Sequence, residues 1–529
     1  MKSYFSIFGI ILVFLSCTKE IDNSALFECN NNAGCIRNIL VDSVPKSVIG
    51  GKRPNPLDIS IVKEAFSQLD PVVKSGFTEE DIRATHKYIA FTPSSDEELG
   101  ALDAIDETKI LLSTYPLDYE VSDGVITSDP RFMLNGYSYQ WAYVPIDYDL
   151  SGIDCPYVYY YDIYAYGSVE KTKGALSLSL AEALEIKANE LCGIELKRVV
   201  ETKSGVTPHG RVRFFDSDSL FSSYRGVEGL SIRTVRAVWS SYTHCDSDGY
   251  FTATETYNYA FRYEIHFSRT DFSIRKNDTT SEVVIKYSNY TGPLYKDILD
   301  DEFCYYANIS RAAIVYYYGD NCGLRRPPMR SDNTLKLAIQ AHLGEDPNAY
   351  GYFYENDLWI LGDRPKLEIF RESNSTRRLN INIYSTVMHE LGHASHWRNN
   401  QSNFNEADGI VLESFARGVQ WLLTKSAYPS YSGPQYRRQS YTGIVQDLID
   451  GYGYKSSSCS STWVDGSLVT TFTTKSYYDN VTGFTPSQIE EAARHSRDWS
   501  SWRAYLVVQY PSVAPVLNIW SAFDYWDSE

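Results

Sequence analysis

The chain has 529 residues, of which 43% are hydrophobic and 22% charged, so it is long enough for two to four domains of roughly 100–200 residues and too apolar for a disordered acidic chain. Its 49 basic and 67 acidic residues give a formal net charge of −18. This balance argues against a nucleic-acid partner and against docking on an anionic membrane surface, because no excess of cations is available to displace counterions.

The N-terminus predicts export. The segment from Phe5 to Leu15 is apolar except for Ser6, which is typical of a signal-peptide core and too short to span a bilayer. It ends at Leu15-Ser16-Cys17, which resembles a bacterial lipoprotein signal. The resemblance implies removal of residues 1–16 and acylation of Cys17; an ordinary secretory signal is the alternative. We therefore expect a protein of the bacterial outer membrane or cell surface, anchored only through this lipid.

The remaining cysteines are compatible with an exported chain. Of the nine cysteines, eight remain after Cys17, and an even number permits disulfides. Proximity in the sequence favours the pairs Cys29–Cys35 and Cys304–Cys322. No CxxC pair is present, which argues against a zinc site made of thiolates.

Composition and turn residues divide the rest of the chain into four regions. A polar tether over 17–56 is followed by an accessory region over 57–204, in which helix and strand signals are mixed. Runs rich in Val, Ile, Thr, Tyr and Phe predict a small antiparallel β-sandwich over 205–295. Helical patterns dominate 296–529. The predicted fold class is therefore multidomain α+β, with a mainly helical C-terminal domain.

The C-terminal region contains the segments that matter for function. Apolar residues at helical spacing predict two central helices, over 383–397 and 407–424. Other predicted segments are helices over 297–318, 441–450 and 486–494, strands over 358–361 and 366–370, and a loop with a short helix over 327–350.

The first of the two central helices carries the sequence His389-Glu390-Leu391-Gly392-His393, an HExxH motif. In a helix, histidines at i and i+4 stand one turn apart on one face, so both imidazoles can bind one Zn²⁺ at about 2.0–2.1 Å. Glu390 is rotated by about 100° from His389 and lies where a base can take a proton from water. The alternative is two histidines on an exposed helix face.

A zinc peptidase needs a third protein ligand and an open fourth position. His396 shares the helix face but lies about 10 Å along the axis from His389, so one ion cannot bind both. We expect His396 at the rim of the site or as a hydrogen-bond donor behind the ligands. The pattern that uses a third histidine would need Gly at 396 and His at 399, and Asn399 stands there instead.

Glu413 is the expected third ligand. It stands beside the apolar stripe of the helix predicted over 407–424, where an uncompensated carboxylate would be costly and a bound cation removes the cost. Glu406 and Asp408 are alternatives, but both stand near the start of that helix, where acidic residues favour the helix dipole.

HExxH with a glutamate on the following helix is the gluzincin pattern, and the chain resembles that group of zinc metallopeptidases. The strings from His389 to Trp397 and from Glu413 to Trp421 resemble those of zinc-binding metallopeptidase lipoproteins of Gram-negative gut anaerobes. The resemblance implies a zincin-like catalytic domain and a protein or peptide substrate. Arg417 departs from thermolysin-like members, which have an Asp there that orients a histidine.

Two further expectations concern the surroundings of the motif. In gluzincins an edge strand before the motif helix pairs with extended substrate, and the resemblance implies this role for 366–370; an ordinary sheet strand is the alternative. Tyr441 and His495 are both candidates for a hydrogen bond to the oxyanion, and the sequence selects neither.

These observations predict a lipid-anchored, zinc-dependent endopeptidase that hydrolyses peptide bonds by metal-activated water. A surface lipoprotein that captures glycan or protein through its tyrosine-rich modules (43 Tyr in all) is one alternative, although a binding protein would have no use for Glu390. A zinc-binding pseudo-peptidase without turnover is the other.

Overall fold

A computed structural model describes most of the chain between residues 44 and 527. Only the backbone is described for residues 15–18, 178–179, 454–464 and 467–476. The predicted signal peptide up to residue 14, most of the tether, the Cys29–Cys35 pair and the strand predicted over 358–361 lie outside the described residues. The described ranges are 15–18, 44–105, 109–166, 178–198, 205–216, 218, 223–276, 281–332, 336–347, 349–354, 365–433, 440–450, 453–464 and 467–527.

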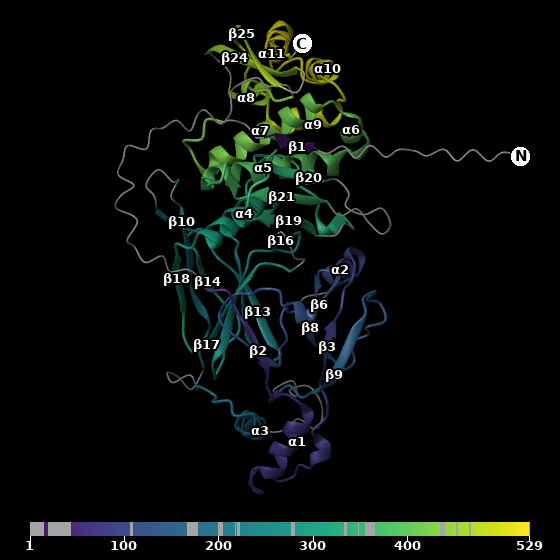
Figure 1. Cartoon of the computed structure of the whole chain (residues 1–529), viewed down its shortest axis with the longest axis vertical. Helices are drawn as coiled ribbons and strands as arrows, with labels where there is room; N and C mark the ends of the chain where they lie inside the picture. The colour runs from purple at the N-terminus through teal and green to yellow at the C-terminus, as the bar shows by residue number, and fades with distance from the viewer. Residues whose placement is uncertain are drawn as a thin grey trace, which may run out of the picture. The chain divides into compact units, whose positions relative to one another are not determined.

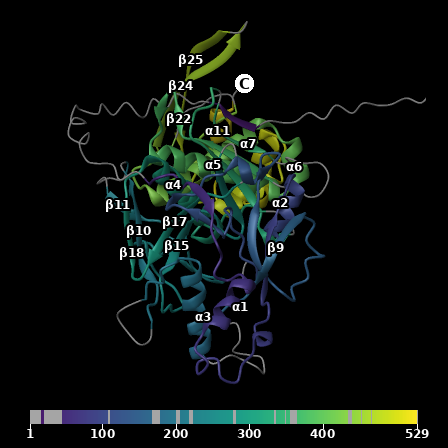
Figure 2. The same ribbon diagram turned by 60° about the horizontal axis from the view of Figure 1, so that its bottom comes forward.

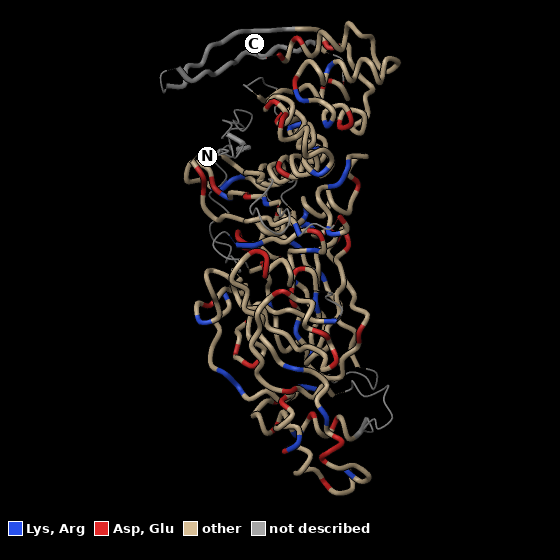
Figure 3. Tube along the Cα trace, turned by 90° about the vertical axis from the view of Figure 1, so that its right-hand side faces the viewer, with Lys and Arg blue, Asp and Glu red and all other residues tan. Residues whose placement is uncertain are grey.

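The chain is mixed α and β, as predicted, and it divides into two compact units. Unit 1 comprises residues 1–37, 315–359 and 363–529, and unit 2 comprises 38–314 and 360–362. The division falls inside the helix α4 (Asp301–Tyr318). Acidic and basic residues are interspersed along the described parts of both units (Figure 3).

Unit 2 combines short strands with helices. Its helix α2 begins where Ser95 accepts a hydrogen bond from the backbone N–H of Glu98 at 3.3 Å, which satisfies a donor that the helix leaves free at its start. The helices are α1 (Ile59–Gln68), α2 (Asp96–Asp103) and α3 (Leu178–Leu191). The strands are β2 (Ile49–Lys52), β3 (His86–Phe91), β4 (Tyr119–Val121), β5 (Gly124–Val125), β6 (Met133–Leu134), β7 (Tyr137–Ser138), β8 (Gln140–Pro145), β9 (Tyr157–Ile163), β10 (His209–Asp216), β11 (Ser223–Gly226), β12 (Ser231–Arg236), β13 (Trp239–His244), β14 (Tyr250–Thr252), β15 (Phe261–His266), β16 (Phe272–Lys276), β17 (Val284–Tyr290) and β18 (Leu294–Ile298).

The sheets of unit 2 connect the two accessory regions. A three-stranded antiparallel sheet has the order β8-β3-β9, and a five-stranded antiparallel sheet has the order β13-β12-β15-β17-β5. In this second sheet β5, from the region predicted over 57–204, pairs with β17, from the region predicted over 205–295. In a further sheet β10, β11 and β18 lie side by side (Figures 1 and 2). The β10–β18 pairing is parallel, so the region over 205–295 is not wholly antiparallel as predicted.

Unit 1 contains the predicted central helices. The helix predicted over 383–397 is confirmed within α5, and the helix predicted over 407–424 is confirmed as α7, which begins two residues later, at Gly409. The helices are α5 (Asn380–Asn399), α6 (Gln401–Glu406), α7 (Gly409–Ala427), α8 (Ile444–Asp450), α9 (Pro486–Arg494), α10 (Trp499–Gln509) and α11 (Val516–Trp526), and the strands are β1 (Leu15–Thr18), β19 (Leu337–His342), β20 (Ala349–Tyr354), β21 (Lys366–Phe370), β22 (Glu372–Ser373), β23 (Thr376–Arg377), β24 (Gly453–Val464) and β25 (Ser467–Asp479). None of the described helices is long and apolar enough to cross a membrane.

The sheet beside α5 corrects two predictions. Residues 366–370 do form a strand, β21, but it is parallel to β19 on one side and antiparallel to β20 on the other. The predicted edge role of 366–370 is therefore wrong, because both edges of β21 are paired. The segment predicted as a loop over 327–350 contains β19 and the start of β20. The edge of β20 that does not face β21 pairs antiparallel with β1, with Ser16 opposite Tyr352.

A close crossing of α5 and α7 lies at the centre of unit 1. Residues 383–397 of α5 are all buried, as expected for a helix that is covered on every side. Gly392, inside the HExxH motif, lies at the crossing: a Cβ atom there would come within 3.2 Å of the Ala416 Cα. The glycine therefore lets the two helix backbones approach closely and brings Glu413, one turn before Ala416, toward the motif.

The proposed Cys304–Cys322 disulfide is wrong. Neither cysteine forms a disulfide. Cys304 is in the first turn of α4, and Cys322 follows the end of this 18-residue helix. A helix rises about 1.5 Å per residue, so the two Cα atoms are much further apart than the roughly 7 Å that a disulfide can bridge. Proximity in the sequence was misleading because the intervening residues form a straight helix.

Candidate metal centre

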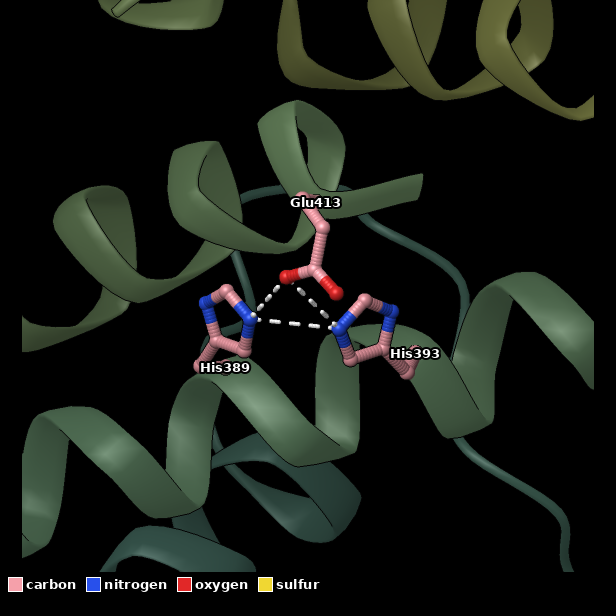
Figure 4. Close-up of side chains that lie close together, drawn as sticks. All are labelled: His389, His393 and Glu413. Carbon is pink, nitrogen blue, oxygen red and sulfur yellow. Dashed lines mark hydrogen bonds and ion pairs between the residues drawn. The ribbon is translucent and has the colours of Figure 1, made fainter. Parts of the chain in front are cut away.

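Three buried side chains from two helices meet at one point. His389 and His393 project from α5, and Glu413 projects from α7 between them (Figure 4). The Nε2 atoms of the two histidines are 3.1 Å apart, and Glu413 Oε2 lies 3.1 Å from His389 Nε2 and 3.5 Å from His393 Nε2. Within the described part of the chain, this is the one group of three His, Cys, Asp or Glu residues that could hold a metal ion.

The spacing of these atoms fits Zn²⁺. Ligands bonded at about 2.0–2.1 Å at the corners of a tetrahedron lie about 3.3 Å from one another. The three distances of 3.1, 3.1 and 3.5 Å bracket that value. Two imidazole lone pairs do not face each other at this distance unless a proton or a cation lies between them. The nitrogen and oxygen donors are also those that zinc prefers in catalytic sites.

Electrostatics at the centre favour a cation. Burial alone would lower the pKa of His389, but its hydrogen bond to Glu413 and the charges of Glu390 and Glu413 outweigh burial, so the pKa is raised. Burial alone would raise the pKa of Glu413, but the charge on His393 and the hydrogen bonds from both histidines hold that pKa well below its usual range. The carboxylate therefore stays ionised and attracts positive charge to the imidazoles.

The other two acidic residues considered as a third ligand lie outside the group of three. Glu406 forms an ion pair with Arg497 at 2.5 Å. Asp408 occupies the residue position just before α7. Neither belongs to the group of three, so the structure brings Glu413 rather than these residues to the histidines.

We expected His396 at the rim of the site, but the structure places it in the core. Its ring is 1% exposed and packs edge-on against Phe404 and Phe415, with centroids 5.4 and 5.3 Å apart. Burial lowers its pKa to about 3, and the charge of His393 adds to the effect. His396 is therefore a neutral residue of the core. It does not belong to the group of His389, His393 and Glu413, which agrees with its exclusion as a metal ligand.

Glu390 lies beside the ligands and against β20. Its side chain is completely buried, with a relative exposure of 0%. On β20, a Cβ atom at Gly351 would come within 2.9 Å of Glu390 Oε1. Gly351 therefore leaves room for the carboxylate next to the strand. Sequence reasoning missed this residue, whose signal is a single glycine inside the aromatic segment Ala349–Tyr354.

Two neighbours of His389 complete the centre. Gln420 of α7 places its Oε1 3.3 Å from His389 Nδ1. Because this oxygen only accepts, Nδ1 carries a proton, and a metal at Nε2 would take the place of the proton that Nε2 donates to Glu413. Sequence reasoning missed Gln420, although it stands seven residues, or two turns, after Glu413. Tyr441 places its ring 6.2 Å from the His389 ring and under the Arg417 guanidinium.

The second candidate for the oxyanion, His495, has different neighbours. Its Nε2 lies 3.2 Å from Glu491, and its ring stacks on Tyr505 at 5.3 Å. Of the two residues that the sequence left open, Tyr441 is therefore the one with a contact to a motif histidine.

Comparison with known proteins adds no relative. No family model matches the chain, no curated protein matches it and no solved structure matches it. The argument about function therefore depends on the geometry of the metal centre, and the gluzincin resemblance stays a prediction.

The ligand assignment predicts which variants lose zinc. We expect one zinc per chain in the purified protein, and a severe loss of zinc in Glu413→Ala, because two histidines alone leave the ion underligated. His396→Leu, which replaces a neutral buried ring, should keep near wild-type zinc. Zinc content measured by elemental analysis tests both. The reverse pattern, with zinc lost in His396→Leu and kept in Glu413→Ala, would show that Glu413 is not the ligand.

The Gln420 contact predicts a smaller effect. Gln420→Ala should weaken zinc binding by about 10- to 100-fold, because the acceptor that orients His389 is lost while all three ligands remain. Gln401→Ala, an exposed glutamine on α6, is the matched control and should bind as wild type. Competition with a chromogenic chelator measures both zinc affinities. Equal affinities for the two variants would show that Gln420 does not contribute to zinc binding.

Proposed function

We propose that the chain is a zinc-dependent endopeptidase of the gluzincin type and that unit 1 contains its zincin-like catalytic domain. The observation that carries this proposal is the buried triangle of His389, His393 and Glu413 with Glu390 directly beside it. A completely buried carboxylate costs stability unless a cation lies close to it, and Glu390 is not itself one of the three ligands. The task of a base for water explains the presence of Glu390 better than a purely structural site does.

The residues divide the chemistry among them. His389, His393 and Glu413 would hold the ion. When bound, zinc lowers the pKa of water toward about 7 and polarises a carbonyl oxygen. Glu390 takes the proton as the water attacks the scissile carbonyl and then delivers it to the leaving amine nitrogen. We assign the hydrogen bond to the oxyanion to Tyr441, because its ring lies beside His389.

The substrate class follows from the edge of β20. This edge pairs antiparallel with the backbone of β1, Leu15 opposite Phe353 and Ser16 opposite Tyr352. It therefore accepts an extended polypeptide through main-chain hydrogen bonds, which require no particular side chain. Removal of residues 1–16 would take away half of β1 and leave this edge to a protein or peptide substrate. A substrate on this edge would lie near Glu390, since Glu390 Oε1 packs against Gly351 of the same strand.

The alternatives fit the centre less well. A binding lipoprotein needs neither a buried Glu390 nor a glycine that makes room for it. A pseudo-peptidase would keep the three ligands and lack turnover, so it differs from the proposal only in the assay below. The net charge of −18 gives no support to a nucleic-acid partner.

The role of Glu390 predicts a separation of binding from catalysis. Glu390→Gln keeps the volume and the three ligands and removes the base, so it should retain zinc and lose at least about 10²-fold in cleavage of a peptide library. Glu406→Gln, at an exposed acid of α6, is the control and should cleave as wild type. Cleavage by Glu390→Gln at the wild-type rate would contradict the role, and a wild-type protein that holds zinc without cleaving any peptide would be a pseudo-peptidase.

Anchoring is a separate proposal, supported by the sequence at Cys17. Cys17→Ala removes the thiol that would carry the lipid, so we expect the protein to move from the membrane fraction to the soluble fraction. Cys322→Ala, a free cysteine outside the signal, should stay with the membrane. Immunoblots of the two fractions measure the shift, and continued membrane association of Cys17→Ala would mean that Cys17 is not the lipid site.

A further inference from the structure

Unit 2 contains a cavity unrelated to the metal centre. Its volume is about 570 Å³, which is within the range of roughly 300–1,000 Å³ that is typical of sites for small ligands. Residues from both the three-stranded and the five-stranded sheet line it, together with the segment that follows β8. The residues that give it its chemistry are His86, Lys109, Asp147, Tyr148, Trp239 and Arg262.

Two arginines share one buried carboxylate beside this cavity, whose lining also includes Lys109, Asp147 and Asp149. Glu264 is completely buried and accepts hydrogen bonds from two guanidinium groups, from Arg233 Nε at 2.6 Å and from Arg262 Nε at 2.8 Å. One carboxylate thus serves two guanidinium groups, so Arg262 shares its counter-ion with Arg233. Arg262 is only partly buried and lines the cavity, so it is where an anion can reach this cluster.

The donors of Arg262 are only partly used. Its Nε is bound to Glu264, whereas neither terminal nitrogen forms a hydrogen bond with the part of the protein that the structure describes. A guanidinium presents its remaining N–H groups in a planar fork that matches the two oxygens of a carboxylate. Arg262 can therefore hold Glu264 on one side and a carboxylate in the cavity on the other.

The other residues that line the cavity suit a ligand that has both a planar apolar surface and polar groups. Trp239, the first residue of β13, is 40% exposed, so its indole is available for stacking. Asp147 offers carboxylate oxygens that accept from hydroxyl or ammonium groups. His86 bonds through Nδ1 to Thr85 at 2.9 Å, and burial lowers its pKa against the opposing charge of Asp147. Its neutral ring adds a second polar contact without adding charge.

We propose that this cavity binds a small carboxylate ligand, with the carboxylate on Arg262 and the body of the ligand against Trp239. Acidic sugars and amino acids share this chemistry, since both combine a carboxylate with groups that donate to Asp147. The proposal does not depend on the peptidase activity, because no ligand of the metal centre lines the cavity.

Binding to the full-length chain by isothermal titration calorimetry tests the proposal. The probes are glucuronate with glucose as its neutral partner, and N-acetylphenylalaninate with its amide as the neutral partner. We expect at least one carboxylate to bind at least tenfold more tightly than its neutral partner, and less tightly at high salt. The pair that shows the difference identifies the source. Absence of a difference in both pairs would overturn the proposal.

A second measurement separates the cavity from the zinc ion, which can also attract carboxylates. Binding should persist unchanged in Glu413→Ala, which disables the metal centre. Binding lost in that variant would place the ligand at the metal centre and overturn the proposal.

Two variants of the cavity complete the test. Arg262→Lys keeps the charge and removes the fork, and Trp239→Ala removes an exposed ring; each should weaken binding at least tenfold. Trp520→Ala, at a comparably exposed tryptophan on α11, is the matched control and should bind as wild type. Because Trp239 is exposed, its variant tests the site even if Arg262→Lys disturbs the Glu264 cluster. Wild-type binding by Trp239→Ala would exclude this cavity.

Discussion

The close crossing of α5 and α7 is the constraint on which the metal centre depends. Two histidines one turn apart define a line along α5, and a third ligand has to come from another element that approaches within a few ångströms. Gly392 permits that approach, because any side chain there would meet the backbone at Ala416. The motif glycine is thus explained by packing, and the positions of Glu413 and Gln420 both follow from the same contact.

The opposite side of α5 imposes a second constraint. β20 lies against this helix, and Gly351 leaves the space that Glu390 occupies. A base can act on water only if it stands between the ligands and the bound substrate. The crossing with α7 fixes the ligands, and the contact with β20 places the base near a strand edge that already pairs with an extended segment. The two faces of one helix therefore provide the metal site and the substrate edge that the proposal requires.

Sequence reasoning selected the three residues that the structure brings together, because that selection depends on local spacing. His389 and His393 are linked by helical periodicity, and Glu413 could be selected because a carboxylate beside an apolar stripe has few uses other than binding a cation. Sequence reasoning failed where the structure depends on pairing between segments that are distant in the sequence. β19 and the start of β20 were included in a segment predicted as a loop with a short helix, and Lys366–Phe370 was placed at an edge, because strand order is set by partners that the local pattern does not show. Cys304 and Cys322 were paired by proximity, whereas the helix between them holds them apart. Gln420 had a signal, the two-turn spacing from Glu413, but its meaning depends on the crossing angle of two helices.

The metal centre and the cavity in unit 2 follow the same physical rule with opposite signs. At the metal centre, acceptors outnumber protons: two imidazole lone pairs and one carboxylate converge, and only a cation satisfies them all. At the cavity, two guanidinium groups share one buried carboxylate, Glu264, and the terminal nitrogens of Arg262 form no hydrogen bond with the described part of the protein. In both places a polar cluster has groups that a ligand of opposite charge would match, and a protein that keeps such a cluster gives up stability for it. A polar cluster of this kind that also borders accessible space is therefore better explained by the binding of a ligand than by a contribution to folding. The sign of the cluster's charge indicates whether that ligand is a cation or an anion.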